Sequence, residues 1–135
     1  MTNTTYTEAR RVHTSLLAAA ERRLLIRIAT RLPAAVNSDH LTALAGLSMA
    51  AAGICYWIGP ASPLAMAMAV VMLAVNWFGD SLDGTVARVR HHERPRYGFY
   101  ADHVLDVVGI LLLFTGLSLG GIMTPLLAAG FLIAY

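Results

Sequence analysis

Residues 80–106 read DSLDGTVARVRHHERPRYGFYADHVLD and hold most of the polar chemistry of the chain. Four aspartates stand in two pairs, Asp80 with Asp83 and Asp102 with Asp106, at spacings of three and four residues. Residues at these spacings share one face of a helix. Each pair adjoins a long apolar run. The stretch therefore predicts two helices whose acidic ends are joined by a charged loop.

The composition of the whole chain is that of an integral membrane protein. Of its 135 residues, 57% are hydrophobic and 13% are charged, compared with about 25% charged in average globular proteins. This composition excludes a disordered tail, a disulfide-stapled secreted module and a basic nucleic-acid-binding domain, so we expect no nucleic-acid partner. Cys55 is the only cysteine and lies in an apolar run, where we expect a buried, inert thiol.

Apolar segments dominate the chain after residue 40. Three of them, taken as helices, are long enough to cross a bilayer; they cover residues 41–58, 64–89 and 97–119. Turns rich in glycine and proline separate them. A fourth segment, residues 122–135, is about half a dozen residues short of a full span. We therefore predict an all-α polytopic transmembrane bundle and expect the sequence to be the N-terminal part of a longer protein.

A basic amphipathic helix is predicted before the first span. Between residues 8 and 32, apolar residues recur at four-residue spacing, and the arginines lie on the other faces of the helix. The apolar row is Val12, Leu16, Ala20, Leu24 and Ile28. This pattern is typical of a helix that lies in the membrane interface, and a soluble helix packed on a partner is the alternative. Pro33 ends the helix, and residues 37–40 supply a turn and an N-cap. Residues 1–34 would thus form a polar tail and a juxtamembrane helix, and residues 35–135 the membrane domain.

The arginines predict how the chain is oriented in the membrane. All ten basic residues are arginines, in one cluster over residues 10–31 and another over residues 88–96. Two spans separate the clusters, so both lie on one side of the membrane, and the positive-inside rule makes that side cytoplasmic. We expect a multi-pass protein of the inner membrane whose acidic cluster faces the cytoplasm.

The four aspartates are costly in an apolar setting. One carboxylate at the centre of a span costs roughly 2.5–3.5 kcal/mol, and four would cost on the order of 10 kcal/mol if unpartnered. Arg88 is the one basic residue on the same helical face. Ligand sets made only of oxygen suit Mg²⁺ or Mn²⁺ rather than Zn²⁺. We therefore predict divalent cations held by Asp80, Asp83, Asp102 and Asp106.

Small residues beside the aspartates indicate what the cations would bind. Gly84 and Ala87 share the face of Asp80, and Arg88 follows about one turn further on. A glycine allows a ligand to approach the backbone closely, and an arginine can fork onto a phosphate. The face therefore predicts a site for a metal-bound diphosphate.

These residues together resemble the signature of the CDP-alcohol phosphotransferases, also called CDP-alcohol phosphatidyltransferases. The match is Asp80-x₂-Asp83-Gly84-x₂-Ala87-Arg88-x₉-Gly98-x₃-Asp102-x₃-Asp106, with eight fixed positions over 27 residues. The stretch from Asn37 to Thr42 is similar to the Pro-Asn-x-x-Thr stretch that opens the family's first span, although Ser38 and Asp39 stand where proline and asparagine are usual. The resemblance covers roughly residues 35–120. Family members have later helices, which help to bind the acceptor and are missing from this sequence.

The resemblance implies a reaction and a role for each motif residue. Such enzymes move a substituted phosphoryl group from a CDP-linked donor to an alcohol and release CMP. Asp80, Asp83 and Asp102 would hold two Mg²⁺ or Mn²⁺ ions on the donor diphosphate, and Asp106 would join them or act as the general base. The resemblance places the CDP moiety against Asp80, Gly84, Ala87, Arg88, Thr42 and Gly98. Candidates for acceptor or phosphate contacts are Arg94, Arg96 and His103.

By analogy, we expect CDP-diacylglycerol as the donor and a homodimer as the assembly. The acceptor stays open among glycerol phosphate, inositol phosphate, serine and an arrangement in which an amino-alcohol reacts with diacylglycerol. The spacing of Gly116 and Gly120 predicts a close helix contact, either within the chain or between protomers.

Three other interpretations remain open from the sequence. A proton or ion pathway would spread its acids through the membrane's depth, whereas these acids cluster at one level. A magnesium-dependent prenyltransferase also binds a diphosphate through acidic helices, and Asn76 followed by Asp80 and Asp83 faintly fits one, but the small-residue face would be unexplained. A non-catalytic membrane scaffold would leave the acidic cluster without a purpose.

Overall fold

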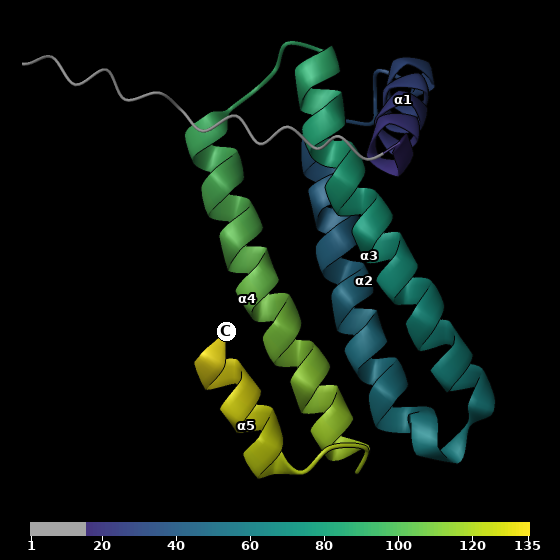
Figure 1. The fold of residues 1–135 in the computed structure, drawn as a ribbon, viewed down its shortest axis with the longest axis vertical. Coiled ribbons are helices and arrows are strands. Elements are labelled where there is room, and N and C mark those ends of the chain that lie inside the picture. The colour runs from purple at the N-terminus through teal and green to yellow at the C-terminus, as the bar shows by residue number, and fades with distance from the viewer. Residues whose placement is uncertain (1–15) are drawn as a thin grey trace, which may run out of the picture.

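The computed structural model describes residues 16–135, which form helices joined by short loops (Figure 1). The elements are α1 (Leu16–Arg31), α2 (Ser38–Ile58), a short 3₁₀ helix η1 (Gly59–Ala61), α3 (Pro63–Val89), α4 (Pro95–Leu119) and α5 (Pro125–Ala134). This part of the chain contains no strand, so the all-α prediction is confirmed. The polar tail and the first residues of the predicted N-terminal helix lie outside the described residues.

Three helices are long and apolar enough to cross a membrane, as the sequence predicted. They cover Ser38–Ala61, Pro63–Val89 and Arg96–Leu119. Large apolar side chains on their outer faces are exposed, for example Leu47 and Val70, as expected where lipid is the solvent. The last segment forms the shorter apolar helix α5, of 10 residues.

Capping residues and prolines set the helix boundaries. Asn37 caps α2: its side chain accepts a hydrogen bond from the His40 backbone N–H at 3.0 Å, and His40 Nδ1 accepts from the Asn37 backbone N–H. These are the two halves of a capping box. α4 begins at Pro95, two residues before the predicted start, because proline is well suited to the first turn of a helix.

α2 is the central helix of the bundle. It packs against both α3 and α4, whereas α3 and α4 make no close backbone contact with each other in the described chain. Glycines permit both contacts: a Cβ on Gly79 would lie 3.0 Å from the Leu41 carbonyl oxygen, and a Cβ on Gly116 would overlap the backbone of Gly53. The close contact predicted at Gly116 therefore forms within the chain, between α4 and α2.

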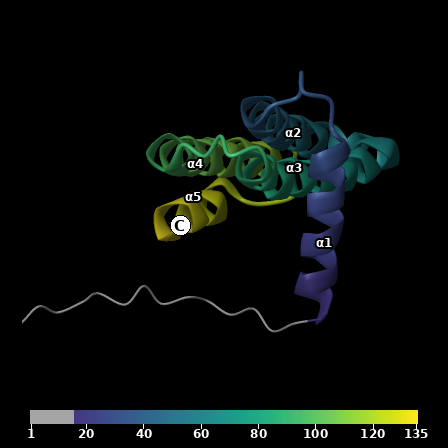
Figure 2. The same cartoon turned by 90° about the horizontal axis from the view of Figure 1, so that it is seen from above.

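α1 lies at the end of the bundle that holds the α3–α4 loop and runs across the long axis of the other helices (Figures 1 and 2). The described arginines of the two clusters, residues 22–31 and 88–96, therefore lie at the same end of the molecule. α1 packs on α3 through Leu25 and Ala29, which are buried with Leu82 and Val86. The buried stripe thus differs from the predicted apolar row, since Leu24 of that row is 55% exposed.

Candidate functional site

A cavity of about 610 Å³ opens beside the α3–α4 loop, between α2, α3 and α4. It exists because α2 separates α3 from α4, so that their facing sides do not close on each other. All three helices and the loop contribute to its wall. Of the residues predicted from the sequence, those that line it are Thr42, Asp83, Gly84, Ala87, Arg88, Arg94, Gly98 and Asp102.

Asp83 is the buried acid of the cavity. It is 6% exposed, and the Thr42 hydroxyl on α2 donates a hydrogen bond of 2.6 Å to its Oδ2. The Gly84 backbone N–H donates to Oδ1. A buried polar group needs such partners, because an unsatisfied one costs about 1–3 kcal/mol. Thr42, predicted to contact nucleotide, therefore also fixes the orientation of an acid on another helix.

The other three acids, Asp80, Asp102 and Asp106, are exposed. Asp80 and Asp106 lie about one turn further from the loop than Asp83 and Asp102, and they do not line the cavity. Within the described side chains, no three acidic, histidine or cysteine residues lie close enough together to hold one metal ion. The acids thus share one region without converging on a point.

Two glycines of the cavity have no packing role. A Cβ on Gly98 would meet no atom within 4 Å, and a Cβ on Gly84 would meet only Arg88 Nη2, at 3.9 Å. They differ in this from Gly79 and Gly116, where a Cβ would lie 3.0 Å or less from the backbone of α2. Since glycine inside a helix costs roughly 0.5–1 kcal/mol relative to alanine, the absent side chains cost stability and leave open space in the cavity.

Arg88 lies along the cavity wall on α3. Its Nε donates to the Gly84 carbonyl oxygen at 3.0 Å, and its Nη2 lies 3.5 Å from Thr85 Oγ1. These bonds hold the guanidinium beside Gly84, within the lining of the cavity. A cation next to an open glycine backbone is suited to a phosphate group.

An ion pair lies at the loop end of the cavity. Arg94 Nη2 donates to both carboxylate oxygens of Asp39, at 2.6 and 2.7 Å, and its guanidinium lies 4.8 Å from the Tyr97 ring centroid. The hydrogen bond to Asp39 raises the pKa of the Arg94 guanidinium. Arg94 therefore joins the loop to the first turn of α2 while remaining charged.

The remaining predicted contacts lie outside the cavity lining. Arg96 is exposed in the first turn of α4. His103 is exposed and stacks on Phe99, with 5.4 Å between the ring centroids. Phe99 itself lines the cavity and is 71% exposed.

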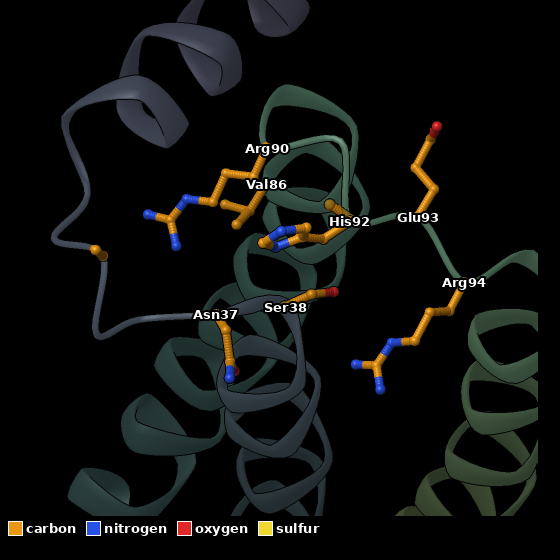
Figure 3. A pocket seen from close by; sticks show the side chains of 9 residues that line it. Asn37, Ser38, Val86, Arg90, His92, Glu93 and Arg94 are labelled. Carbon is orange, nitrogen blue, oxygen red and sulfur yellow. The ribbon is translucent and has the colours of Figure 1, made fainter.

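A second cavity, of about 590 Å³, lies next to the first. Figure 3 shows its wall of Asn37, Ser38, Arg90 and His92, with Arg90 extended toward the α1–α2 linker. Arg90 Nη2 donates to the carbonyl oxygens of Leu32 and Pro33 at 3.0 Å, and Nη1 donates to that of Val36. Arg90 thus fixes the linker that leads into α2.

Several residues that line the first cavity, between α2, α3 and α4, were not predicted from the sequence. These are Ser38, Asp39, Ala43, His92, Glu93, Tyr97, Phe99, Ala101 and Leu105. Asp39 stands three residues before Thr42, so helical spacing could have placed it on the same face. The loop residues carry no such periodic signal.

The fold and the cavity define an all-helical protein of the membrane type with an acidic, glycine-lined site at one end. Comparison with known protein families matches residues 35–135 to CDP-alcohol phosphatidyltransferase. The match covers most of the chain, so this protein belongs to the CDP-alcohol phosphatidyltransferase family. No curated protein and no solved structure matched the chain.

Family membership implies transferase chemistry, CDP-linked substrates and a bilayer environment. It favours a phosphatidyl transfer role over prenyl transfer. Asn76, the residue that faintly fitted a prenyltransferase, donates a hydrogen bond of 3.0 Å to the Ala45 carbonyl oxygen. Its amide group therefore joins α3 to α2.

The family is generally dependent on divalent metals. The aspartates of this chain supply the type of ligand atom that such ions prefer. Their ligand atoms are all carboxylate oxygens, which suit Mg²⁺ and Mn²⁺. Among the described side chains, the one ion pair joins Arg94 to Asp39, and none of the four aspartates has an ion-pair partner. The negative charge of the site is therefore available to a cation.

Proposed function

We propose that this protein transfers a phosphatidyl group from CDP-diacylglycerol to an alcohol and releases CMP. One observation carries the proposal: a single cavity is lined by motif residues from three successive helices. They are Thr42 from α2, Asp83, Gly84, Ala87 and Arg88 from α3, and Gly98 and Asp102 from α4.

The open glycines support binding of the CDP moiety. Gly84 and Gly98 line the cavity from α3 and α4. The one atom within 4 Å of either Cβ position is Arg88 Nη2, 3.9 Å from that of Gly84. The nucleotide would lie between these helices, with its diphosphate near Arg88. Thr42 would act on the donor through Asp83, whose carboxylate it holds.

Asp80, Asp83 and Asp102 would hold two Mg²⁺ or Mn²⁺ ions, and Asp106 would join them or act as the general base. Such ions, when bound, neutralise charge on the oxygens of a transferring phosphoryl group. Asp83 is held in place by hydrogen bonds, whereas the other three side chains are exposed and free to adjust. Asp83 would therefore be the fixed member of the ligand set.

Asp106 would act as the general base. It would accept the proton of the acceptor hydroxyl while the hydroxyl oxygen bonds to phosphorus and the bond from phosphorus to the CMP oxygen breaks. CMP leaves with that electron pair, and the proton stays on Asp106 until it passes to water. A positioned base contributes about 10²–10⁴-fold to such a step.

The separation of α3 and α4 supports a lipid donor. Because the two helices make no close backbone contact, acyl chains could leave the cavity sideways while a polar acceptor enters from the loop end. The arginine-rich end would face the cytoplasm, in the inner membrane of the cell. We also propose a homodimer, for which the chain offers extensive exposed apolar surface.

The proposal is tested by reconstituting the full-length protein with CDP-diacylglycerol, Mn²⁺ and a panel of alcohols. CMP release that depends on one alcohol is the expected result. Asp106→Asn should retain donor binding and lose about 10²–10⁴-fold in turnover. Absence of CMP release with every alcohol, combined with pyrophosphate release from a prenyl diphosphate, would overturn the proposal. Normal turnover by Asp106→Asn would refute the role of Asp106 alone.

A further inference from the structure

The side of α1 that faces away from the bundle carries a row of arginines. Arg23, Arg27 and Arg31 follow one another at four-residue spacing and are all exposed. This spacing aligns them along one side of the helix. The opposite side, through Leu25 and Ala29, is buried against α3. The row therefore has no part in holding α1 on the bundle.

The row is electrostatically unfavourable for the chain by itself. Like charges four residues apart on a helix repel each other. Within the described side chains, the one ion pair is between Arg94 and Asp39, so none of the row arginines is neutralised there. An anionic partner outside the described chain would remove this repulsion.

The position of α1 indicates which partner is available. α1 runs across the long axis of the membrane-length helices, at the end that holds the α3–α4 loop (Figures 1 and 2). Leu24 and Ile26 flank the row and are 55% and 38% exposed. Arginines bordered by exposed apolar side chains are typical of helices that contact both lipid headgroups and the start of the acyl chains.

We propose that the Arg23–Arg27–Arg31 row binds the phosphate groups of anionic glycerophospholipids in the leaflet next to α1. Arginine is suited to this role because its planar guanidinium forks onto phosphate oxygens. Each basic side chain near an anionic surface contributes about fivefold in affinity. The contact fixes α1 in the headgroup layer and holds the linker that Arg90 joins to α3.

The proposal is tested by hydrogen exchange of α1 in the full-length protein reconstituted in nanodiscs. Phosphatidylcholine alone is compared with a mixture of phosphatidylcholine and phosphatidylglycerol. We expect slower exchange of α1 amides in the mixture, and loss of that difference at high salt or in the triple variant Arg23→Gln, Arg27→Gln, Arg31→Gln. Equal exchange in both lipids, or an unchanged difference in the triple variant, would overturn the proposal.

Two further variants separate lipid binding from loss of structure. The triple variant with lysine at the same three positions keeps the charge and should keep most of the phosphatidylglycerol effect. Glu21→Gln on the same helix should leave the effect intact or increase it. Native mass spectrometry should show fewer phosphatidylglycerol molecules retained by the glutamine variant than by the lysine variant. Equal retention by the two variants would contradict the proposal.

Discussion

Gly84 and Gly98 are two residues of the site for which the structure distinguishes a ligand role from a packing role. At both positions an added Cβ would point into open space. The resemblance to the family implied both residues as contacts of the CDP moiety. Their side of the helix could be read from the sequence, whereas the empty space beside them could not, because it depends on how far α4 lies from α3.

Gly84→Ala and Gly98→Ala are expected to affect stability and binding in opposite directions. Alanine favours the helix, so each variant should gain up to about 1 kcal/mol in the free energy of unfolding. The added methyl group should weaken CDP-diacylglycerol binding, measured by calorimetry. Gly130→Ala, on α5, is the matched control because its Cβ, like that of Gly98, would meet no atom within 4 Å. Unchanged donor affinity in both site variants would contradict the assignment.

The role of Thr42 can be tested separately from that of the glycines. Thr42→Val removes the hydroxyl that donates to Asp83 and nearly preserves the shape of the side chain. We expect destabilisation by about 1–3 kcal/mol, since a buried carboxylate loses a partner, and a higher Mn²⁺ concentration for half-maximal activity. Thr42→Ser retains the hydroxyl and should restore the Mn²⁺ dependence. Identical behaviour of the valine and serine variants would show that the hydrogen bond has no functional effect.

Contacts between residues far apart in the sequence could not be predicted for this site. The ion pair from Arg94 to Asp39 joins positions 55 residues apart, and no local spacing connects them. Arg90 was likewise predicted only as part of a basic cluster, although it donates to three carbonyl groups of the α1–α2 linker. Such partners depend on the tertiary arrangement of α1 and α2.

At the scale of whole helices, the sequence predicted the three long apolar helices and their order, because apolar runs, prolines and capping residues mark them clearly. The face of α1 that packs on α3 was not predicted from the sequence, since the apolar row was expected to lie in the membrane interface. Adjacent stripes of α1 are both apolar, and α3 buries the one that holds Leu25 and Ala29. The sequence also left open where Gly116 makes its contact, and the structure places that contact against α2.

Gly116→Ala tests the contact between α2 and α4. Its Cβ would overlap the backbone of Gly53, which cannot move as a side chain can. We expect a loss of about 1–3 kcal/mol in the free energy of unfolding, as for other overpacked sites, measured by thermal unfolding in detergent. Gly46→Ala is the control on the same interface, because its Cβ would lie 3.2 Å from the flexible Leu105 side chain. Equal stability of the two variants would mean that α2 and α4 are not in close contact.

At the scale of the molecule, the central feature is that α2 holds α3 and α4 apart at the acidic end. One acid of each pair, Asp83 on α3 and Asp102 on α4, then lines the same cavity. The apolar outer faces remain available to lipid. Composition and charge distribution predicted the membrane class and the shared end of the arginine clusters. They could not predict that the cavity forms between α3 and α4, since this follows from the glycine contacts of α2.

The central claim is that this cavity binds a CDP-linked donor together with divalent cations held by its aspartates. It is tested most directly by calorimetric titration of the full-length protein with CDP-diacylglycerol, with Mn²⁺ and then with EDTA in its place. We predict binding with Mn²⁺, little or no binding with EDTA, and weak binding by Asp83→Asn and Asp102→Asn under both conditions. Binding of equal strength with Mn²⁺ and with EDTA, unchanged in the two variants, would contradict the claim.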